Sequence, residues 1–364
     1  AAGGVTLTPE ELAANRTALG DDIRAHPTDD EYHRDRSPVF EQITAPLLSA
    51  GNWGGQGLHL RGNVEGFVRS ASEQKWLELH GLEHWTHFYT DYGRELQLEF
   101  FDHFLKGEDN GWDRRPPVLL QVRQVDGSVV ERTEDGWPIP RTEWTELHLH
   151  PDLTLSDQPP VEPAELSFEA MGDGLTFRTA PFDTETEISG PSAATFWVSS
   201  STTDADLFVV LRVFDPDGDE VTFQGALDPH KPVSQGWLRA SHRATDPEIS
   251  TFYRPYHSHT DPEPLEPGDV VELDVEIWPT SIVVPAGYTV ALTLLGRDYT
   301  NDVAGDDAHA GIASFKNRFS GCGPFIHDDP HNRPADVFAG TTTLHVGPDR
   351  PAKVVLPVIP PAGA

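Results

Sequence analysis

The sequence predicts a chain in two parts: an α/β region over residues 1–113 and an all-β region over residues 114–364. Two observations support this division. Before Gly107, short apolar segments alternate with segments of helical periodicity, which is typical of a parallel sheet with helices on its faces. After Pro116-Pro117, helical periodicity is almost absent and short β-rich segments recur between turns, which favours a sandwich or jelly roll.

The α/β region opens with a predicted helix over residues 8–19. Thr8 is a suitable N-cap and Pro9 suits the first turn, while Gly20 is expected to end the helix. We expect the two strands that follow to be adjacent and parallel. In chain order, the remaining elements are a strand at 45–51, a helix at 62–71, a strand at 75–80 and a helix at 89–106.

The β-rich region contains six clear strand candidates, separated by turn signals and by long loops at 153–163 and 298–333. The turns are rich in Asp, Pro and Gly, as at 215–218, and we expect the run of aspartates there to form a hairpin turn. The predicted strands are 118–125, 144–150, 194–199, 207–214, 270–278 and 289–295.

The composition excludes several classes of function. The net charge is −33, from 59 acidic and 26 basic residues, so nucleic acid and anionic membranes are not expected partners. The sequence has no apolar run long enough for a transmembrane helix and no signal-peptide pattern, which favours the cytoplasm over secretion. A single cysteine, Cys322, excludes an internal disulfide framework.

The acidic surface has two explanations, adaptation to high salt or an ordinary solvated surface. If the organism is a halophile, added salt should relieve the mutual repulsion of 59 carboxylates. We therefore expect the Tm to rise by several degrees between low and molar potassium chloride, measured by differential scanning fluorimetry. A flat or falling Tm would remove the explanation by salt adaptation.

No nucleophile of the α/β-hydrolase type is evident, because the sequence contains no Gly-x-Ser-x-Gly elbow. Ser192 and Ser320 are expected to be turn residues. Cys322 is followed by His327 and His331, but nothing in the sequence holds a base against its thiol. The residues at 327–331 match no standard metal-ligand spacing, so neither a metal nor an organic cofactor is expected.

Four segments of the α/β region are distinctive: RSP at 36–38, ITAPLL at 43–48, GLHLRG at 57–62 and FFDHFLKG at 100–107. With them, residues 36–107 resemble the last strands of the hydrolase domain in the cocaine esterase / X-prolyl dipeptidyl-peptidase (CocE/NonD) family. The β-rich residues resemble the family's C-terminal jelly roll, which is galactose-binding-like. The resemblance therefore implies a partial α/β-hydrolase domain at 1–113 and an X-Pro dipeptidyl-peptidase C-terminal-type jelly roll at 114–364. The matching segments of the β-rich region are GP at 190–191, SSSTTDAD at 199–206, DPDG at 215–218, GWLRAS at 236–241, WPTS at 278–281 and LP at 356–357.

The resemblance implies a split catalytic triad, with the serine elbow outside this chain and His84, after the second strand, as the base. The family's acid follows the first strand, where this sequence has Gly55 instead of an aspartate. Three carboxylates are candidate substitutes: Glu65, Glu83 and Asp91. The residues expected to line the active site are Trp53, Gly55, Gln56, His59 and Trp85.

The function implied is hydrolysis of acyl esters or X-Pro peptide bonds through an acyl-serine intermediate. The expected partners are a small ester or peptide substrate and a missing N-terminal hydrolase segment, and a homo-oligomer stays open. Without that segment, this chain is expected to be inactive. The alternative is a non-catalytic β-rich module, for ligand binding or for structure, that carries a relic of the hydrolase.

Overall fold

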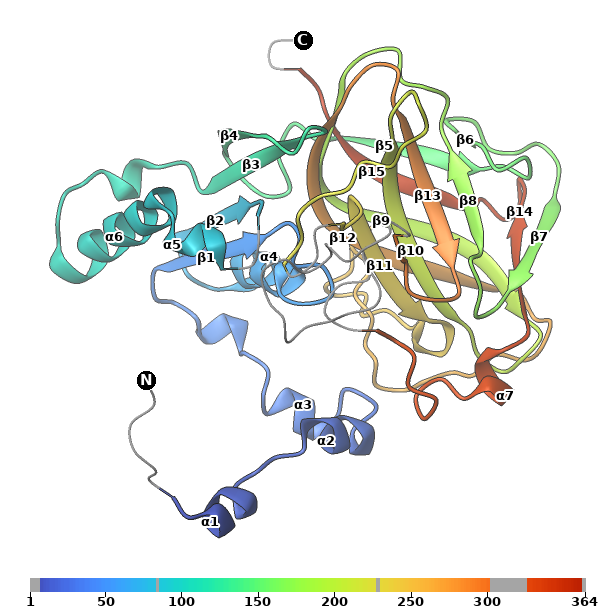
Figure 1. Cartoon of the computed structure of the whole chain (residues 1–364), viewed down its shortest axis with the longest axis horizontal. Helices are drawn as coiled ribbons and strands as arrows, with labels where there is room; N and C mark the ends of the chain where they lie inside the picture. The colour runs from blue at the N-terminus through green and yellow to red at the C-terminus, as the bar shows by residue number, and fades with distance from the viewer. Residues whose placement is uncertain (1–6, 83–84, 227–229, 302–325, 362–364) are drawn as a thin grey trace.

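The computed structural model describes residues 7–82, 85–226, 230–301 and 326–361. Three short helices, α1 (Pro9–Ala14), α2 (Leu19–Ala25) and α3 (Glu31–Arg34), lie below the body of the molecule in Figure 1 and bury no residues. Thr8 caps α1 as predicted, but the single helix ending at Gly20 is wrong, because α1 ends at Ala14 and Gly20 lies inside α2. Helices in proteins are stabilised mainly by packing of one face, and a helix that buries no residue therefore ends after a few residues.

The α/β elements confirm the parallel pair of strands. β1 (Leu47–Asn52) pairs in parallel with β2 (Lys75–His80), and Leu47 lies opposite Lys75. The other elements are η1 (Phe40–Gln42), α4 (Leu60–Arg69), α5 (Thr86–Tyr89), α6 (Asp91–Lys106) and η2 (Trp112–Arg114).

Helices α4 and α6 cover opposite faces of this pair. Successive strand residues point to opposite faces, and Leu77 packs with α4 whereas Trp76 packs with α6. Each helix therefore buries its apolar side against one face of the sheet. No described strand pairs with the second edge of β1.

The composition changes near residues 107–117, but the sheet continues across that point. β3 (Val118–Gln124) pairs in parallel with β2 and, at its far end, with β12 (Val271–Val284). The α/β strands and most β-rich strands therefore share one sheet of 11 strands. Its main path runs β1-β2-β3-β12-β9-β15-β5-β6, with β4, β7 and β14 paired off this path.

The β-rich part is a pair of sheets that enclose the main core, seen at the right of Figure 1. The second sheet has the order β11-β10-β13-β8, and its Val209 and Leu292 pack with Phe196 and Leu273 of the first. All six predicted strands are confirmed. Besides β3 and β12, the elements of the β-rich part are β4 (Val129–Glu134), β5 (Glu143–Leu149), β6 (Leu155–Ser156), β7 (Ala164–Glu169), β8 (Leu175–Arg178), β9 (Thr186–Ser200), β10 (Asp206–Phe214), β11 (Ser234–Arg239), η3 (Ala240–His242), β13 (Thr289–Leu295), α7 (Ala335–Phe338), β14 (Thr341–Val346) and β15 (Lys353–Ile359).

Two local expectations have opposite outcomes. The hairpin turn after β10 is confirmed, because the Asp215 carboxylate accepts the amides of Asp217 and Asp219, each at 2.9 Å. The turn at Ser192 is wrong, since Ser192 is a buried residue inside β9. Ser320 and Cys322 lie outside the described residues.

In the part of the chain that the structure describes, no helix has the length and apolar character to span a membrane.

The two parts meet at the turn that follows β1. The amide of Ala226 donates to the carbonyl of Gly54 at 3.0 Å. A Cβ at Gly54 would lie 2.2 Å from the Cα of Gly225, so only glycine permits this close approach. The β-rich part thus fixes the backbone at the carboxyl end of β1, which is where an α/β sheet places its functional residues.

Candidate active site

The turn after β1 is held by two buried side chains. Trp53 is 0% exposed and its indole nitrogen donates to the Gln121 carbonyl at 2.8 Å. Gln56 is equally buried and donates to the Val233 carbonyl at 3.0 Å, while it accepts from the Gln235 amide at 3.2 Å. Trp53 and Gln56 were predicted to line the active site. In this structure their side chains are part of the protein interior and hold the turn in place.

Gly55 stands where the resemblance leads us to expect an acid, and the backbone explains its small size. Its amide donates to the Asn52 carbonyl at 2.9 Å, which closes a tight turn. A Cβ at this position would lie only 3.0 Å from the same carbonyl oxygen. An aspartate would therefore require the turn to shift.

The predicted base His84 and its neighbour Glu83 lie outside the described residues. The segment just before them is anchored. The side-chain amide of Asn52, the last residue of β1, donates to the backbone carbonyls of Gly81 and Leu82, at 2.9 and 2.6 Å. Leu82 has a φ of 64°, a conformation that a leucine adopts at a cost. The turn after β1 thus fixes the start of the segment that contains His84.

The other predicted residues lie in different places. Glu65, on α4, is buried and pairs with Arg254 at 2.8 Å, on the sheet face opposite α6. Asp91, in the first turn of α6, is exposed and pairs with Arg94 at 3.1 Å. His59 is exposed just before α4. Trp85 is the one predicted residue that lines a described cavity of the α/β part.

That cavity, which we call the β1-edge cavity, has a volume of about 490 Å³. Most of its wall is apolar and aromatic. Its polar groups are mainly residues that the sequence analysis did not single out: Glu78, His80, His87 and Tyr92. The described residues that line it are Leu48, Ala50, Glu78, His80, Trp85, His87, Phe88, Tyr89, Tyr92, Gly93, Leu96, Gln97, Phe100 and Phe101.

The polar groups of the β1-edge cavity are buried and close together. His80 donates from Nδ1 to Glu78 Oε2 at 2.7 Å, and Tyr92 donates to Glu78 Oε1 at 3.4 Å. The His80 and His87 rings are stacked with their centroids 4.6 Å apart. Burial lowers the pKa of His87, and burial next to Glu78 raises the pKa of Tyr92. The Glu78–His80 pair has the carboxylate-to-Nδ1 arrangement that holds a catalytic histidine in one tautomer.

The sequence did carry a signal for this pair. Glu78 and His80 are two residues apart in a predicted strand, so their side chains share one face of the sheet. An ionisable pair on a strand buried on both faces is unusual. His87 could not be assigned in the same way, because it lies on α5 and only the tertiary structure places its ring against His80.

A second cavity, the histidine cavity, lies between residues 27–37, α4 and the β-rich part and has a volume of about 530 Å³. Trp237 and Trp278 meet edge to face on its wall, 5.6 Å between centroids. His257 and His259 line it, and His242 Nδ1 lies 3.1 Å from His259 Nδ1.

The histidine cavity should make stability sensitive to acid. His259 is partly exposed to solvent. Burial of its imidazole against the cavity wall and repulsion by the neighbouring His242 nevertheless lower the pKa of His259 to about 4. The folded protein therefore resists protonating His259, and stability that is complete above pH 6.5 is lost as the pH falls toward 4. We expect His259→Asn, which tolerates the residue's φ of 52°, to make the fall of Tm with pH shallower. An unchanged slope, equal to that of the exposed-site control His331→Gln, would contradict this.

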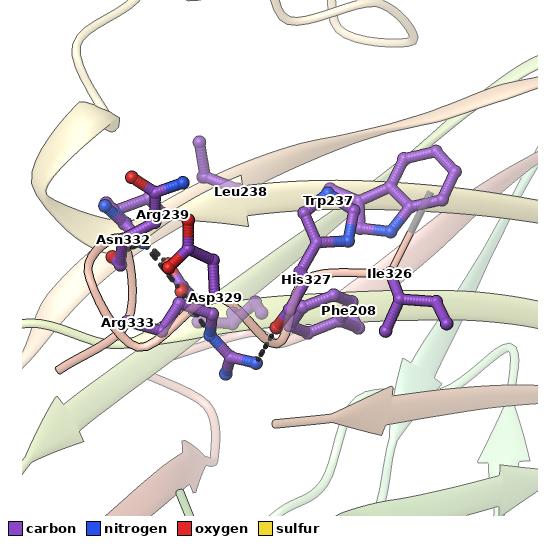
Figure 2. Close-up of a pocket in the computed structure, with 11 residues that line it drawn as sticks. Phe208, Trp237, Leu238, Arg239, Ile326, His327, Asp329, Asn332 and Arg333 are labelled. Carbon is purple, nitrogen blue, oxygen red and sulfur yellow. Dashed lines mark hydrogen bonds and ion pairs between the residues drawn. The ribbon is translucent and has the colours of Figure 1, made fainter. Parts of the chain in front are cut away.

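A third cavity, of about 260 Å³, lies on the β-rich part and is drawn in Figure 2. Its charged groups neutralise one another: Arg239 and Arg333 both pair with Asp206, at 2.7 and 2.8 Å. Arg333 also donates to the His327 carbonyl at 2.8 Å, marked by a dashed line in Figure 2. The two guanidinium groups are thus engaged within the protein.

Comparisons with known proteins agree with this architecture. Residues 110–355 match the family model of the X-Pro dipeptidyl-peptidase C-terminal non-catalytic domain. A Mycobacterium bovis protein named as a serine esterase is 26% identical over 246 residues, which are 57% of this chain and 36% of that protein. Cocaine esterase of a Rhodococcus species is 21% identical over 305 residues, 72% of this chain and 45% of that enzyme.

A solved structure extends the similarity to almost the whole chain. The crystal structure of a CocE/NonD family hydrolase from Staphylococcus aureus aligns with a TM-score of 0.84 and 28% identity, over 94% of this chain and 59% of that one. This chain thus spans only part of the length of its relatives, which are hydrolases. The chain belongs to the family defined by the X-Pro dipeptidyl-peptidase C-terminal domain and corresponds to the C-terminal part of a CocE/NonD hydrolase.

Proposed function

We propose that this chain supplies the C-terminal part of a serine hydrolase that cleaves acyl esters or X-Pro peptide bonds. The observation that carries the proposal is the match to the S. aureus hydrolase over 94% of this chain, the α/β strands included. The named activities of the relatives, serine esterase and cocaine esterase, favour ester substrates, and the name of the matching domain favours X-Pro peptides. The β-rich part would be a jelly roll of the galactose-binding-like type.

The nucleophile in this proposal comes from polypeptide that extends the sheet beyond β1. Two features support an extension at this edge. β1 has no partner there among the described strands, and the β1-edge cavity beside it leaves Trp85, Phe88 and Tyr89 exposed. Exposed strand edges and clustered aromatic side chains usually mark surfaces that another element covers.

His84 acts as the base in this mechanism. It removes the proton from the serine hydroxyl as the serine oxygen attacks the substrate carbonyl, and it then protonates the leaving alcohol or amine. Water hydrolyses the acyl-serine by the same steps, with His84 again as the base. Glu65 and Asp91 are already engaged in ion pairs with Arg254 and Arg94, which leaves Glu83 as the first acid to test.

The Glu78–His80 pair is a second candidate for the base. Its carboxylate and imidazole are already hydrogen-bonded, and His80 Nε2 has no hydrogen-bond partner among the described residues. A serine hydroxyl within reach of Nε2 would complete a triad. Substitution of each histidine separately, described in the Discussion, decides between His80 and His84.

A serine-directed fluorophosphonate tests the proposal. This chain alone should not be labelled, because none of its serines lies in a Gly-x-Ser-x-Gly elbow. A protein that combines this chain with the N-terminal half of the hydrolase should be labelled on a serine of that half. Labelling of a serine within residues 1–364, located by peptide mass spectrometry, would overturn the assignment.

A non-catalytic β-rich module is the alternative function. The description of the matching domain as non-catalytic favours it, as does Gly55 at the expected position of the acid. In that case the combined protein would remain unlabelled although it folds, and no ester or X-Pro substrate would be cleaved.

A further inference from the structure

We propose that Glu78, His80 and His87 bind a divalent transition-metal ion of the Zn²⁺ class at the floor of the β1-edge cavity. Each of the three side chains offers one donor atom, and these atoms all lie within 4.8 Å of one another. Two of the residues come from β2 and the third comes from α5. The proposal takes His84 as the base of the hydrolytic reaction, which uses no metal; an ion on the Glu78–His80 pair would exclude His80 from that role.

The imidazoles have nitrogen atoms that the protein leaves without a partner. His80 is 8% exposed and His87 is 7% exposed, yet His80 Nε2 and His87 Nδ1 make no hydrogen bond within the described residues, whereas His87 Nε2 accepts from the Gln121 side-chain amide at 3.2 Å. A buried polar atom without a partner costs about 1–3 kcal/mol. His80 Nδ1 lies 2.7 Å from Glu78 Oε2, so an ion bound between these two atoms would replace the proton that they share, and His80 would then carry its proton on Nε2.

The charge of the cavity also favours a cation. Glu78 is 1% exposed and, among the described residues that line the cavity, is the only Asp, Glu, Lys or Arg. A buried carboxylate needs a positive charge or several donors to offset the loss of hydration. Glu131, which lies opposite Gln121 across the β3–β4 pair, adds negative potential at His87. A divalent ion would neutralise this field.

The donor set indicates the class of metal. Two imidazoles and one carboxylate are typical ligands of catalytic zinc sites, in which a fourth position stays open to water or a small ligand. Zinc bonds of about 2.1 Å in a tetrahedron separate the donors by roughly 3.4 Å. The donor atoms, which all lie within 4.8 Å of one another, reach this spacing by small side-chain rotations, and the 490 Å³ cavity leaves space for the fourth ligand.

The test is metal binding to this chain after a chelator has removed any bound ion. Isothermal titration with Zn²⁺ should give one site, and Co²⁺ should give the visible absorption of a tetrahedral complex. His87→Gln and Glu78→Gln should each weaken binding at least tenfold. The matched control is the double variant His242→Gln/His259→Asn in the histidine cavity, which should bind as the unsubstituted chain does.

Three results would overturn the proposal: no binding to the folded chain, binding that survives both His87→Gln and Glu78→Gln, or binding that the control variant abolishes. If the variants fail to fold, X-ray absorption of the zinc-loaded unsubstituted chain decides. It should show two imidazoles and oxygen donors, whereas three imidazoles would place the metal in the histidine cavity. These readouts do not depend on hydrolysis, so this proposal and the proposed function can fail separately.

Discussion

Replacing His84 with alanine in a protein that carries the complete hydrolase is expected to slow acylation of the serine by roughly 10⁴- to 10⁶-fold. The serine hydroxyl is a weak nucleophile at neutral pH and depends on a base to remove its proton. The measurement is the rate of fluorophosphonate labelling, together with kcat/KM for a chromogenic ester. The loss will be closer to 10⁴-fold if the base has no acid partner, because Gly55 stands where the family has an aspartate.

Two further variants make the His84 result specific. His331→Ala removes a histidine whose side chain is 81% exposed, and it should leave the labelling rate unchanged. His80→Gln tests the Glu78–His80 pair. Full activity of His84→Ala, with loss of activity in His80→Gln, would transfer the role of the base to His80. Circular dichroism should confirm that each variant is folded.

Trp53→Ala should lower the free energy of unfolding by about 4 kcal/mol, since large-to-small changes at a buried tryptophan typically cost 3–5 kcal/mol. Trp53 is fully buried, packs with Trp137 at 6.4 Å between ring centroids and donates its indole N–H to Gln121. Its loss opens a cavity at the point where β1, β3 and the β-rich part meet. Urea denaturation followed by circular dichroism provides the measurement.

Two controls separate packing from hydrogen bonding in the Trp53 result. Trp53→Phe keeps most of the apolar volume and loses the hydrogen bond, so it should cost roughly half as much. Trp85→Ala removes an exposed tryptophan from the β1-edge cavity and should change stability by less than about 0.5 kcal/mol. A loss in Trp53→Ala as small as the one expected for Trp85→Ala would show that the core does not depend on Trp53.

Much of the fold could be predicted from local patterns. The parallel strands, α4, α6 and six β-rich strands were identified because apolar residues repeat with the period of each element. Three of the strands that were missed have weaker patterns. β4 and β7 are largely exposed, and β6 has only two residues. The predicted helix at 8–19 was wrong because capping residues mark a start, whereas packing decides how far a helix continues.

The candidate site depended more strongly on tertiary structure. Sequence motifs identified the turn after β1 and the segment at His84 through the resemblance to the family, and they identified Gly55 as a departure from it. They did not show that Trp53 and Gln56 face the interior, because both side chains are held by residues far along the chain, in β3 and near β11.

By itself, the sequence determined the class of this protein, its acidic surface and the order of its main elements, because these follow from composition and from contacts between near neighbours. Tertiary structure alone decided that β3 joins the α/β strands to the β-rich sheet, and that His87 reaches the Glu78–His80 pair. The physical reason is that strand pairing and burial depend on residues far apart in the chain, which no local pattern specifies.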